Sequence, residues 1–226
     1  MTAGIYVASV WIVPLVLAIT LHEAAHGYAA LRFGDDTALR AGRISLNPLR
    51  HVDLMGTIII PGLLLFSGAG FLFGYAKPVP VDFYRLANPR RDMVWVAAAG
   101  PATNIVLAVA SALVLHIAYV LPSPIAQWFG DNLGNSVRIN VLLAVFNMLP
   151  LPPLDGGRVA VGLLPDPIAA PLARLEPYGL FILIGAIFLL PFIGSQLGVD
   201  INIFRWLVGG PYDFLVDLIA RLTGHG

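Results

Sequence analysis

The residues from His22 to His26, His-Glu-Ala-Ala-His, place two imidazoles and a carboxylate at the end of an apolar run. Residues 5–21 contain no Asp, Glu, Lys, Arg or His. On a helix, positions i and i+4 lie about 40° apart, so His22 and His26 share a face and can bind one metal ion. Glu23 stands beside that face, where it can take a proton from a metal-bound water. Because ionisable groups at membrane depth usually mark function, the pattern predicts a zinc hydrolase with its active site inside a membrane.

The composition supports a membrane setting for this motif. Of 226 residues, 58% are hydrophobic and 12% are charged, and the mean hydropathy is +0.83. Soluble domains carry about 25% charged residues, so we expect an integral membrane protein surrounded by a lipid bilayer. The formal net charge is zero, which argues against nucleic acid as a partner. The chain has no Cys, so any zinc must be held by histidines and carboxylates.

Several apolar segments are long enough to position the motif within a bilayer, whose core needs about 20 helical residues. We expect helices over residues 6–33, 93–121 and 178–192, and a returning apolar stretch over 138–153. Residues 123–137 and 156–176 are expected to be connections. The predicted fold class is an all-α polytopic membrane protein with about four to six transmembrane helices and a short membrane-associated β-hairpin or re-entrant element.

Three segments are less regular. Residues 39–46 alternate loosely, a pattern that suits a short strand or hairpin and, equally, a cytoplasmic loop that only packs. Residues 54–75 are interrupted by proline and glycines and flanked by basic residues, which favours a re-entrant hairpin or broken helix over an ordinary bent span. Residues 201–222 are broken by Gly-Gly-Pro at 209–211, so this tail either spans the membrane or lies at its interface.

A catalytic zinc usually takes three protein ligands and a water. The metzincin spacing of zinc peptidases would need a histidine at position 32 as the third ligand. This chain has Arg32 there. Asp155 is a better candidate, because it follows an apolar stretch and is followed by two glycines that let the backbone turn sharply. An unpaired carboxylate at membrane depth is costly, and a metal ion offsets that cost. The alternative is that Asp155 caps a helix.

Three motifs in this order resemble the site-2 protease family of intramembrane zinc metalloproteases. They are His-Glu-Ala-Ala-His at 22–26, Gly-Pro-Ala-Thr-Asn at 100–104 and Asn-Met-Leu-Pro-Leu-Pro-Pro-Leu-Asp-Gly at 147–156. A further similar stretch covers 74–80, and the resemblance extends roughly over residues 15–157. The first motif alone is moderately specific, whereas the three together are strongly so.

The resemblance implies a set of residue roles. One zinc ion per chain would be bound by His22, His26 and Asp155. Glu23 would be the general base for the zinc-bound water and then the proton donor to the leaving amine. Asn147 would stabilise the oxyanion or hold the substrate backbone, and Asn104 would line the site from the middle helix. Both asparagines have an alternative role as hydrogen-bonding residues between helices.

The resemblance also implies one intramembrane metalloprotease domain over 1–226, with a catalytic core at about 5–160 and further membrane segments at about 177–222. The gap at 122–137 is too short for a PDZ domain, and the C-terminus has no room for a CBS pair, which indicates the compact type of the family. We expect a transmembrane protein or peptide as substrate. We expect a prokaryotic plasma membrane, and the distribution of basic residues favours an external N-terminus with the active site nearer the cytoplasm. The sequence does not indicate the oligomeric state. The competing hypothesis is a non-enzymatic metal-binding membrane protein or transporter.

Overall fold

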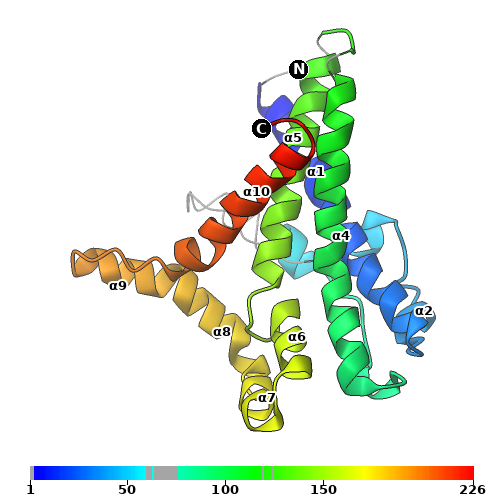
Figure 1. Cartoon of the computed structure of the whole chain (residues 1–226), viewed down its shortest axis with the longest axis vertical. Coiled ribbons are helices and arrows are strands. Elements are labelled where there is room, and N and C mark those ends of the chain that lie inside the picture. The colour runs from blue at the N-terminus through cyan, green and yellow to red at the C-terminus, as the bar shows by residue number, and fades with distance from the viewer. Residues whose placement is uncertain (1–2, 60–62, 64–75, 119, 124) are drawn as a thin grey trace.

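The computed structural model describes residues 3–59, 63, 76–118, 120–123 and 125–226, and the regular elements within this part of the chain are helices. Three long helices form its centre (Figure 1): α1 (Ala3–Arg32), α4 (Pro89–Ala118) and α5 (Ile125–Asn147). Each of the three contacts the other two. Helix α4 runs antiparallel to α1, since Asn104 bonds to Ala18 and His22 while Val96 bonds to His26.

Small side chains allow these helices to approach closely. Ala18 of α1 and both Ala97 and Ala108 of α4 are at most 2% exposed. In a bilayer, small residues at a helix contact let the backbones approach, and dispersion then holds the helices together. Long apolar side chains point outward instead, with Leu17 52% and Val106 66% exposed. This distribution suits helices whose outer surface faces lipid.

Helix α5 differs because the face it turns toward α1 and α4 is polar. Asn132, Asn135 and Asn140 are each at most 8% exposed. Asn135 donates a hydrogen bond to the Val10 carbonyl of α1 (2.9 Å). Asn140 Oδ1 accepts a hydrogen bond from Asn104 of α4 (2.8 Å). Burying an amide is costly unless it is hydrogen-bonded, so the bonds of Asn135 and Asn140 fix how α5 is rotated against its neighbours.

Shorter helices connect and extend the centre. Between α1 and α4 lie α2 (Thr37–Arg40), η1 (Pro48–Arg50), η2 (Leu54–Ile59) and η3 (Phe83–Arg85). After α5 come α6 (Asp155–Leu163), which packs on α4, and α7 (Asp166–Ala173). An arm then projects from the centre (Figure 1), formed by η4 (Glu176–Tyr178), α8 (Gly179–Ile184), η5 (Gly185–Leu189) and α9 (Leu190–Gln196). Finally η6 (Arg205–Gly209) and α10 (Gly210–Leu222) return to α5, where Val208 and Ile219 join the buried Val141 in an apolar cluster.

Within the described residues, three helical stretches are long and apolar enough to cross a bilayer: Gly4–Arg32, Pro89–Ala118 and Asp166–Gln196. The protein is therefore a helical membrane protein, and the helices predicted over 6–33, 93–121 and 178–192 are confirmed. The count of about four to six spans stays a prediction.

Two predicted connections are wrong. Residues 125–137 form the first half of α5, where Asn132 and Asn135 are buried and both Trp128 and Asn135 bond to α1. Residues 156–176 are largely helical and form α6 and α7. The strand or hairpin expected over 39–46 is not confirmed, since these residues hold the end of α2 and a turn. The tail at 203–222 is one helical stretch that continues through Gly209, Gly210 and Pro211. Most of the re-entrant element expected over 54–75 lies outside the described residues.

Candidate metal centre

Three side chains of metal-ligand type converge between α1 and α6. His22 and His26 lie one turn apart on α1, and Asp155 is the first residue of α6. Asp155 Oδ2 lies 3.2 Å from His22 Nε2 and 3.4 Å from His26 Nε2. The two Nε2 atoms are 3.1 Å apart. The side chains are only 8–12% exposed, so the cluster is almost closed to solvent.

The outer nitrogen of each imidazole is held by helix α4. His26 Nδ1 lies 2.7 Å from the Val96 carbonyl oxygen. A carbonyl only accepts hydrogen bonds, so this Nδ1 carries the proton and Nε2 presents a lone pair. His22 Nδ1 lies 2.5 Å from Asn104 Oδ1. The same tautomer follows for His22 if Asn104 presents its oxygen to the ring.

A chain of buried amides sets that orientation of Asn104. Asn140 donates from Nδ2 to the Ser136 carbonyl (2.9 Å), which can only accept. Asn140 Oδ1 therefore faces Asn104 and accepts from its Nδ2 (2.8 Å). Asn104 is left with Oδ1 directed at His22. Asn104 and Asn140 are at most 1% exposed, so water does not compete for these bonds.

The cluster fits a divalent metal ion. Asp155 Oδ2 is buried and has no hydrogen-bond donor within the described part of the chain. The lone pairs of the two imidazole Nε2 atoms face this oxygen and each other. These electron-rich atoms repel one another unless a cation lies between them. Two imidazole nitrogens and one carboxylate oxygen are a ligand set that zinc takes in catalytic sites. Asp155 does not act as a helix cap, since Leu154 occupies the N-cap position.

Glycines allow the backbone to bring these side chains together. A Cβ on Gly100 of α4 would lie 2.5 Å from His26 Nε2 and 2.6 Å from His22 Nε2. A Cβ on Gly156 would lie 2.2 Å from the Met148 carbonyl oxygen, and one on Gly157 would lie 2.1 Å from the backbone nitrogen of Pro152. Only glycine fits such close approaches, so the turn after Asp155 can fold back against the end of α5.

Glu23 lies next to the histidines on α1 and is half-buried. Its Oε2 accepts a hydrogen bond from the Val79 backbone N–H (2.8 Å). Val79 belongs to residues 76–82, which have no helix or strand assignment and run past this part of α1. The bond holds one carboxylate oxygen in place and leaves the other available.

The remaining predicted residue, Asn147, is the last residue of α5. Its Nδ2 donates to the Leu143 carbonyl of its own helix (3.0 Å). No hydrogen bond joins it to the histidines or Asp155 in the described chain. The structure thus places His22, His26, Asp155 and Asn104 in one cluster of close contacts, and places Asn147 outside it.

Sequence comparison supplies a relative from Bacillus subtilis whose name is "Putative zinc metalloprotease YwhC". It is 38% identical over 190 residues, which cover 82% of this chain and 82% of the relative. The chain belongs to the site-2 protease family. As a member of this family it is a zinc-dependent metalloendopeptidase.

Two further relatives of this site-2 protease have similar names. "Putative zinc metalloprotease Rip2" from Mycolicibacterium smegmatis is 32% identical over 171 residues, 75% of this chain and 62% of the relative. "Putative zinc metalloprotease MJ0611" from Methanocaldococcus jannaschii is 32% identical over 138 residues, 61% of this chain and 62% of the relative. No protein-family model and no solved structure matches the chain.

Sequence reasoning missed Asn140 and Ser136 as parts of this site-2 protease centre. Their spacing carried a signal, because Ser136 and Asn140 lie four residues apart and hence on one helix face. Asn132 extends the same row by one more turn. A row of polar residues in a helix that packs within a membrane usually faces another helix, which would have indicated the buried network.

Proposed function

We propose that the protein is a zinc-dependent intramembrane endopeptidase that hydrolyses peptide bonds within or next to transmembrane segments. The observation that carries the proposal is the buried cluster of His22, His26 and Asp155, built on a helix long and apolar enough to cross the bilayer. Glu23 stands beside it on the same helix. A site at this position meets substrates that are themselves in the membrane.

His22 and His26 would hold one zinc ion through Nε2, and Asp155 would hold it through Oδ2. When bound, zinc polarises the scissile carbonyl and lowers the pKa of a water ligand to about 7. The chain prepares these ligands in advance. Val96 and Asn104 hold both rings by Nδ1, so neither imidazole must rotate or lose a proton from Nε2.

Glu23 would act as general base and then as general acid. Its carboxylate takes one proton from the attacking water while the water oxygen forms a bond to the carbonyl carbon. The same proton then passes from Glu23 to the leaving nitrogen as the C–N bond breaks. The Val79 N–H fixes Glu23 Oε2 during this exchange, so the other oxygen carries the proton.

Asn147 would donate to the carbonyl oxygen of the scissile bond as negative charge develops there. Its amide has two N–H groups, and one is used by the Leu143 carbonyl. An oxyanion donor of this kind contributes about 3 kcal/mol to lowering the barrier. Asn104, expected to line the site, would act through His22 because it is fully buried and its amide is used by His22 and Asn140.

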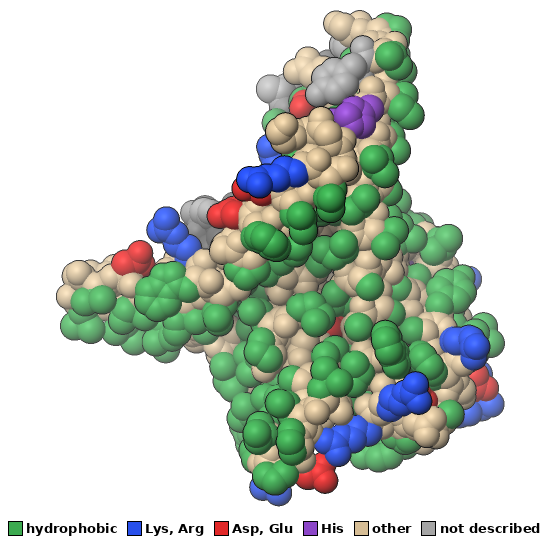
Figure 2. All heavy atoms as spheres, in the orientation of Figure 1, with side chains coloured by type: hydrophobic (Ala, Val, Ile, Leu, Met, Phe, Trp, Pro, Cys, Tyr) green, Lys and Arg blue, Asp and Glu red, His purple; other side chains and the backbone are tan. Residues whose placement is uncertain are grey.

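The proposed location is a prokaryotic plasma membrane, with the metal centre nearer the cytoplasmic side. Most Lys and Arg side chains on the face in Figure 2 gather toward the end where α1 stops and α4 starts. Cytoplasmic loops carry an excess of such residues. His26 is six residues from the end of α1, about 9 Å along the helix axis. The proposed partners are a transmembrane protein or peptide substrate and the lipid bilayer.

The test compares wild type with Glu23→Gln, both purified in detergent, by zinc content and by cleavage of a single-span peptide. We expect about one zinc per chain in both proteins. Cleavage that is sensitive to a chelator should occur with wild type and fall about 100- to 10,000-fold in the variant. Equal cleavage by both proteins would show that Glu23 is not the base. Absence of zinc from both would refute the metal centre. The competing hypothesis of a non-enzymatic membrane protein or transporter would then be favoured.

A further inference from the structure

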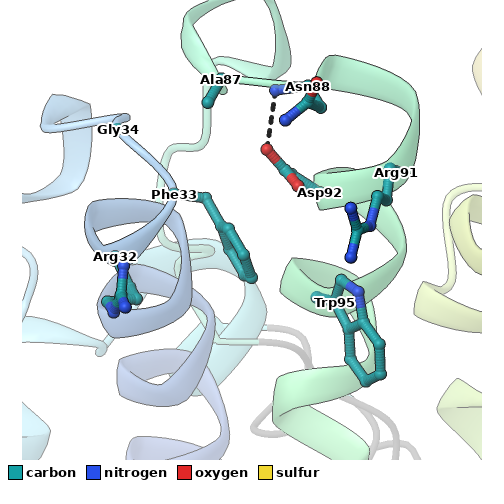
Figure 3. A pocket seen from close by; sticks show the side chains of 8 residues that line it. All are labelled: Arg32, Phe33, Gly34, Ala87, Asn88, Arg91, Asp92 and Trp95. Carbon is teal, nitrogen blue, oxygen red and sulfur yellow. Dashed lines mark hydrogen bonds between the residues drawn. The ribbon is translucent and has the colours of Figure 1, made fainter.

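A hollow of about 410 Å³ lies between the end of α1 and the start of α4. Figure 3 shows its lining side chains, which come from the last turn of α1 and the loop after it, and from the loop before α4 and its first two turns. The lining residues are Arg32, Phe33, Gly34, Ala87, Asn88, Arg91, Asp92 and Trp95. It is separate from the metal cluster, since none of His22, His26 and Asp155 lines it.

Two arginines of this hollow have no partner among the residues that the structure describes. Arg32 and Arg91 are exposed, and neither guanidinium makes a hydrogen bond or ion pair within the described residues. Neighbouring arginines are paired: Arg85 lies 2.7 Å from Asp36, and Arg90 lies 2.7 Å from Asp166. The planar guanidinium matches the geometry of phosphate oxygens and binds them by two parallel hydrogen bonds.

The carboxylate of the hollow does not cancel both charges. Asp92 is 4% exposed, and its Oδ2 accepts the backbone N–H of Asn88 (2.7 Å), the bond drawn in Figure 3. The Asp92 carboxylate thus hydrogen-bonds the backbone at the start of α4, where the helix dipole stabilises its negative charge. Two guanidiniums and one carboxylate leave a net formal charge of +1, which matches a phosphodiester with one negative charge.

The position of the hollow favours a lipid as the source of that phosphate. Arg32 is the last residue of α1 and Arg91 is the third of α4, and both helices can cross a bilayer. Trp95 lies one turn further into α4, about 6 Å along its axis, and is 58% exposed. Tryptophan prefers the headgroup level of a bilayer, and basic hollows between transmembrane helices on the cytoplasmic side bind anionic headgroups.

We propose that this hollow binds the phosphodiester of an anionic phospholipid between Arg32 and Arg91, with the glycerol and upper acyl chain against Phe33 and Trp95. The site holds the junction of α1 and α4 at the membrane surface, two turns of α1 from His26. The proposal is independent of proteolysis, because none of its residues belongs to the metal cluster.

The experiment uses the full chain, delipidated in neutral detergent and offered phosphatidylglycerol and phosphatidylcholine with the same acyl chains. Native mass spectrometry counts the lipids retained. We expect one phosphatidylglycerol to be retained in preference to phosphatidylcholine. Each change, Arg32→Gln or Arg91→Gln, should lower retention about fivefold, and the double variant about 25-fold, the equivalent of about 1 kcal/mol per basic residue at an anionic surface.

Arg174→Gln is the matched control, because Arg174 also lacks a side-chain partner in the described chain but lies outside the hollow. Its retention should equal that of wild type. Zinc content of the double variant should also be unchanged, which shows that the protein remains folded. Equal retention of both lipids, or equal loss with Arg174→Gln, would overturn the proposal. Thermal stabilisation of the delipidated chain by inorganic phosphate as strong as that by phosphatidylglycerol would also overturn it, in favour of a soluble phosphate.

Discussion

Replacing Gly100 by alanine tests the arrangement of the metal centre most directly. A Cβ at this position would lie 2.5 Å from His26 Nε2 and 2.6 Å from His22 Nε2, whereas ordinary contacts begin near 3.4 Å. The overlap to be relieved is therefore about 0.9 Å. Neither ring can simply retreat, since Asn104 and Val96 hold them to α4, the helix that carries the new methyl group.

The magnitude follows from two opposing effects. Overpacking a well-packed interior costs about 1–3 kcal/mol, while glycine to alanine within a helix gains about 0.5–1 kcal/mol. The clash is expected to dominate, and it falls on the atoms that would bind zinc. We therefore expect Gly100→Ala to bind zinc about 10- to 100-fold more weakly, similar to the loss of a hydrogen bond that orients a ligand.

Gly134→Ala is the matched control, because Gly134 lies inside α5 and a Cβ there meets nothing within 4 Å. It should keep wild-type zinc affinity and gain thermal stability from helix propensity. Zinc affinity is measured by competition with a chromogenic chelator, and stability by thermal unfolding in the same detergent. If Gly100→Ala binds zinc like wild type and unfolds no earlier than Gly134→Ala, the imidazoles do not pack on Gly100 and the described cluster is wrong.

Two other predictions concern the buried network and the end of α1. Asn140→Leu should weaken zinc binding about 10- to 100-fold, because it removes the hydrogen bond that orients Asn104 toward His22. Asn132→Leu changes the same face of α5 outside this hydrogen-bonded network, so it should leave zinc binding unchanged. Equal losses of zinc affinity in a titration of the two variants would exclude a role for amide orientation. Burial raises the pKa of the Asp35 carboxyl, but hydrogen bonds from Thr37 and from the Asp82 N–H (2.8 Å) outweigh it and hold that pKa below its ordinary value. A lowered pKa in the folded state stabilises the protein above the ordinary aspartate pKa of about 3.9, and the effect is lost as the pH falls through the folded value. The melting temperature of wild type should therefore exceed that of Asp35→Asn at neutral pH, and the gap should close below about pH 4; a gap that widens on acidification would contradict this reasoning.

The sequence predicted that His22, His26 and Asp155 come together, because the signal for each is local. His22, Glu23 and His26 lie within one helical turn, and Asp155 is marked by prolines before it and glycines after it. The contacts of Asn104 could not be predicted from its neighbours in the sequence. Its contacts with His22 and Asn140 link residues that are 82 and 36 positions away along the chain, and their geometry depends on how three helices pack.

The start of α5 shows why the topology was harder to predict than the site. Residues 123–137 contain charged and amide side chains, which by composition alone resemble a solvated connection. In the folded protein several of them bond across helices, as Tyr6 does with Asp131 (2.5 Å) and Trp128 with Ser9 (2.9 Å). Hydropathy averages every side chain around a helix, so it cannot distinguish a polar face turned inward from one turned to water.

The polar face of α5 also has a consequence for how the chain is made. A lone helix carrying Asn132, Asn135, Arg138 and Asn140 would insert poorly into lipid, since a charged residue near the centre of a span costs about 2.5–3.5 kcal/mol. Helices α1 and α4 precede α5 in synthesis and carry partners for its amides, including the Val10 carbonyl and Asn104. We infer that α5 takes its place only once these two helices are in position to bond its amides. A newly made chain thus acquires the buried amides that hold the His22 ring in the same step that docks α5.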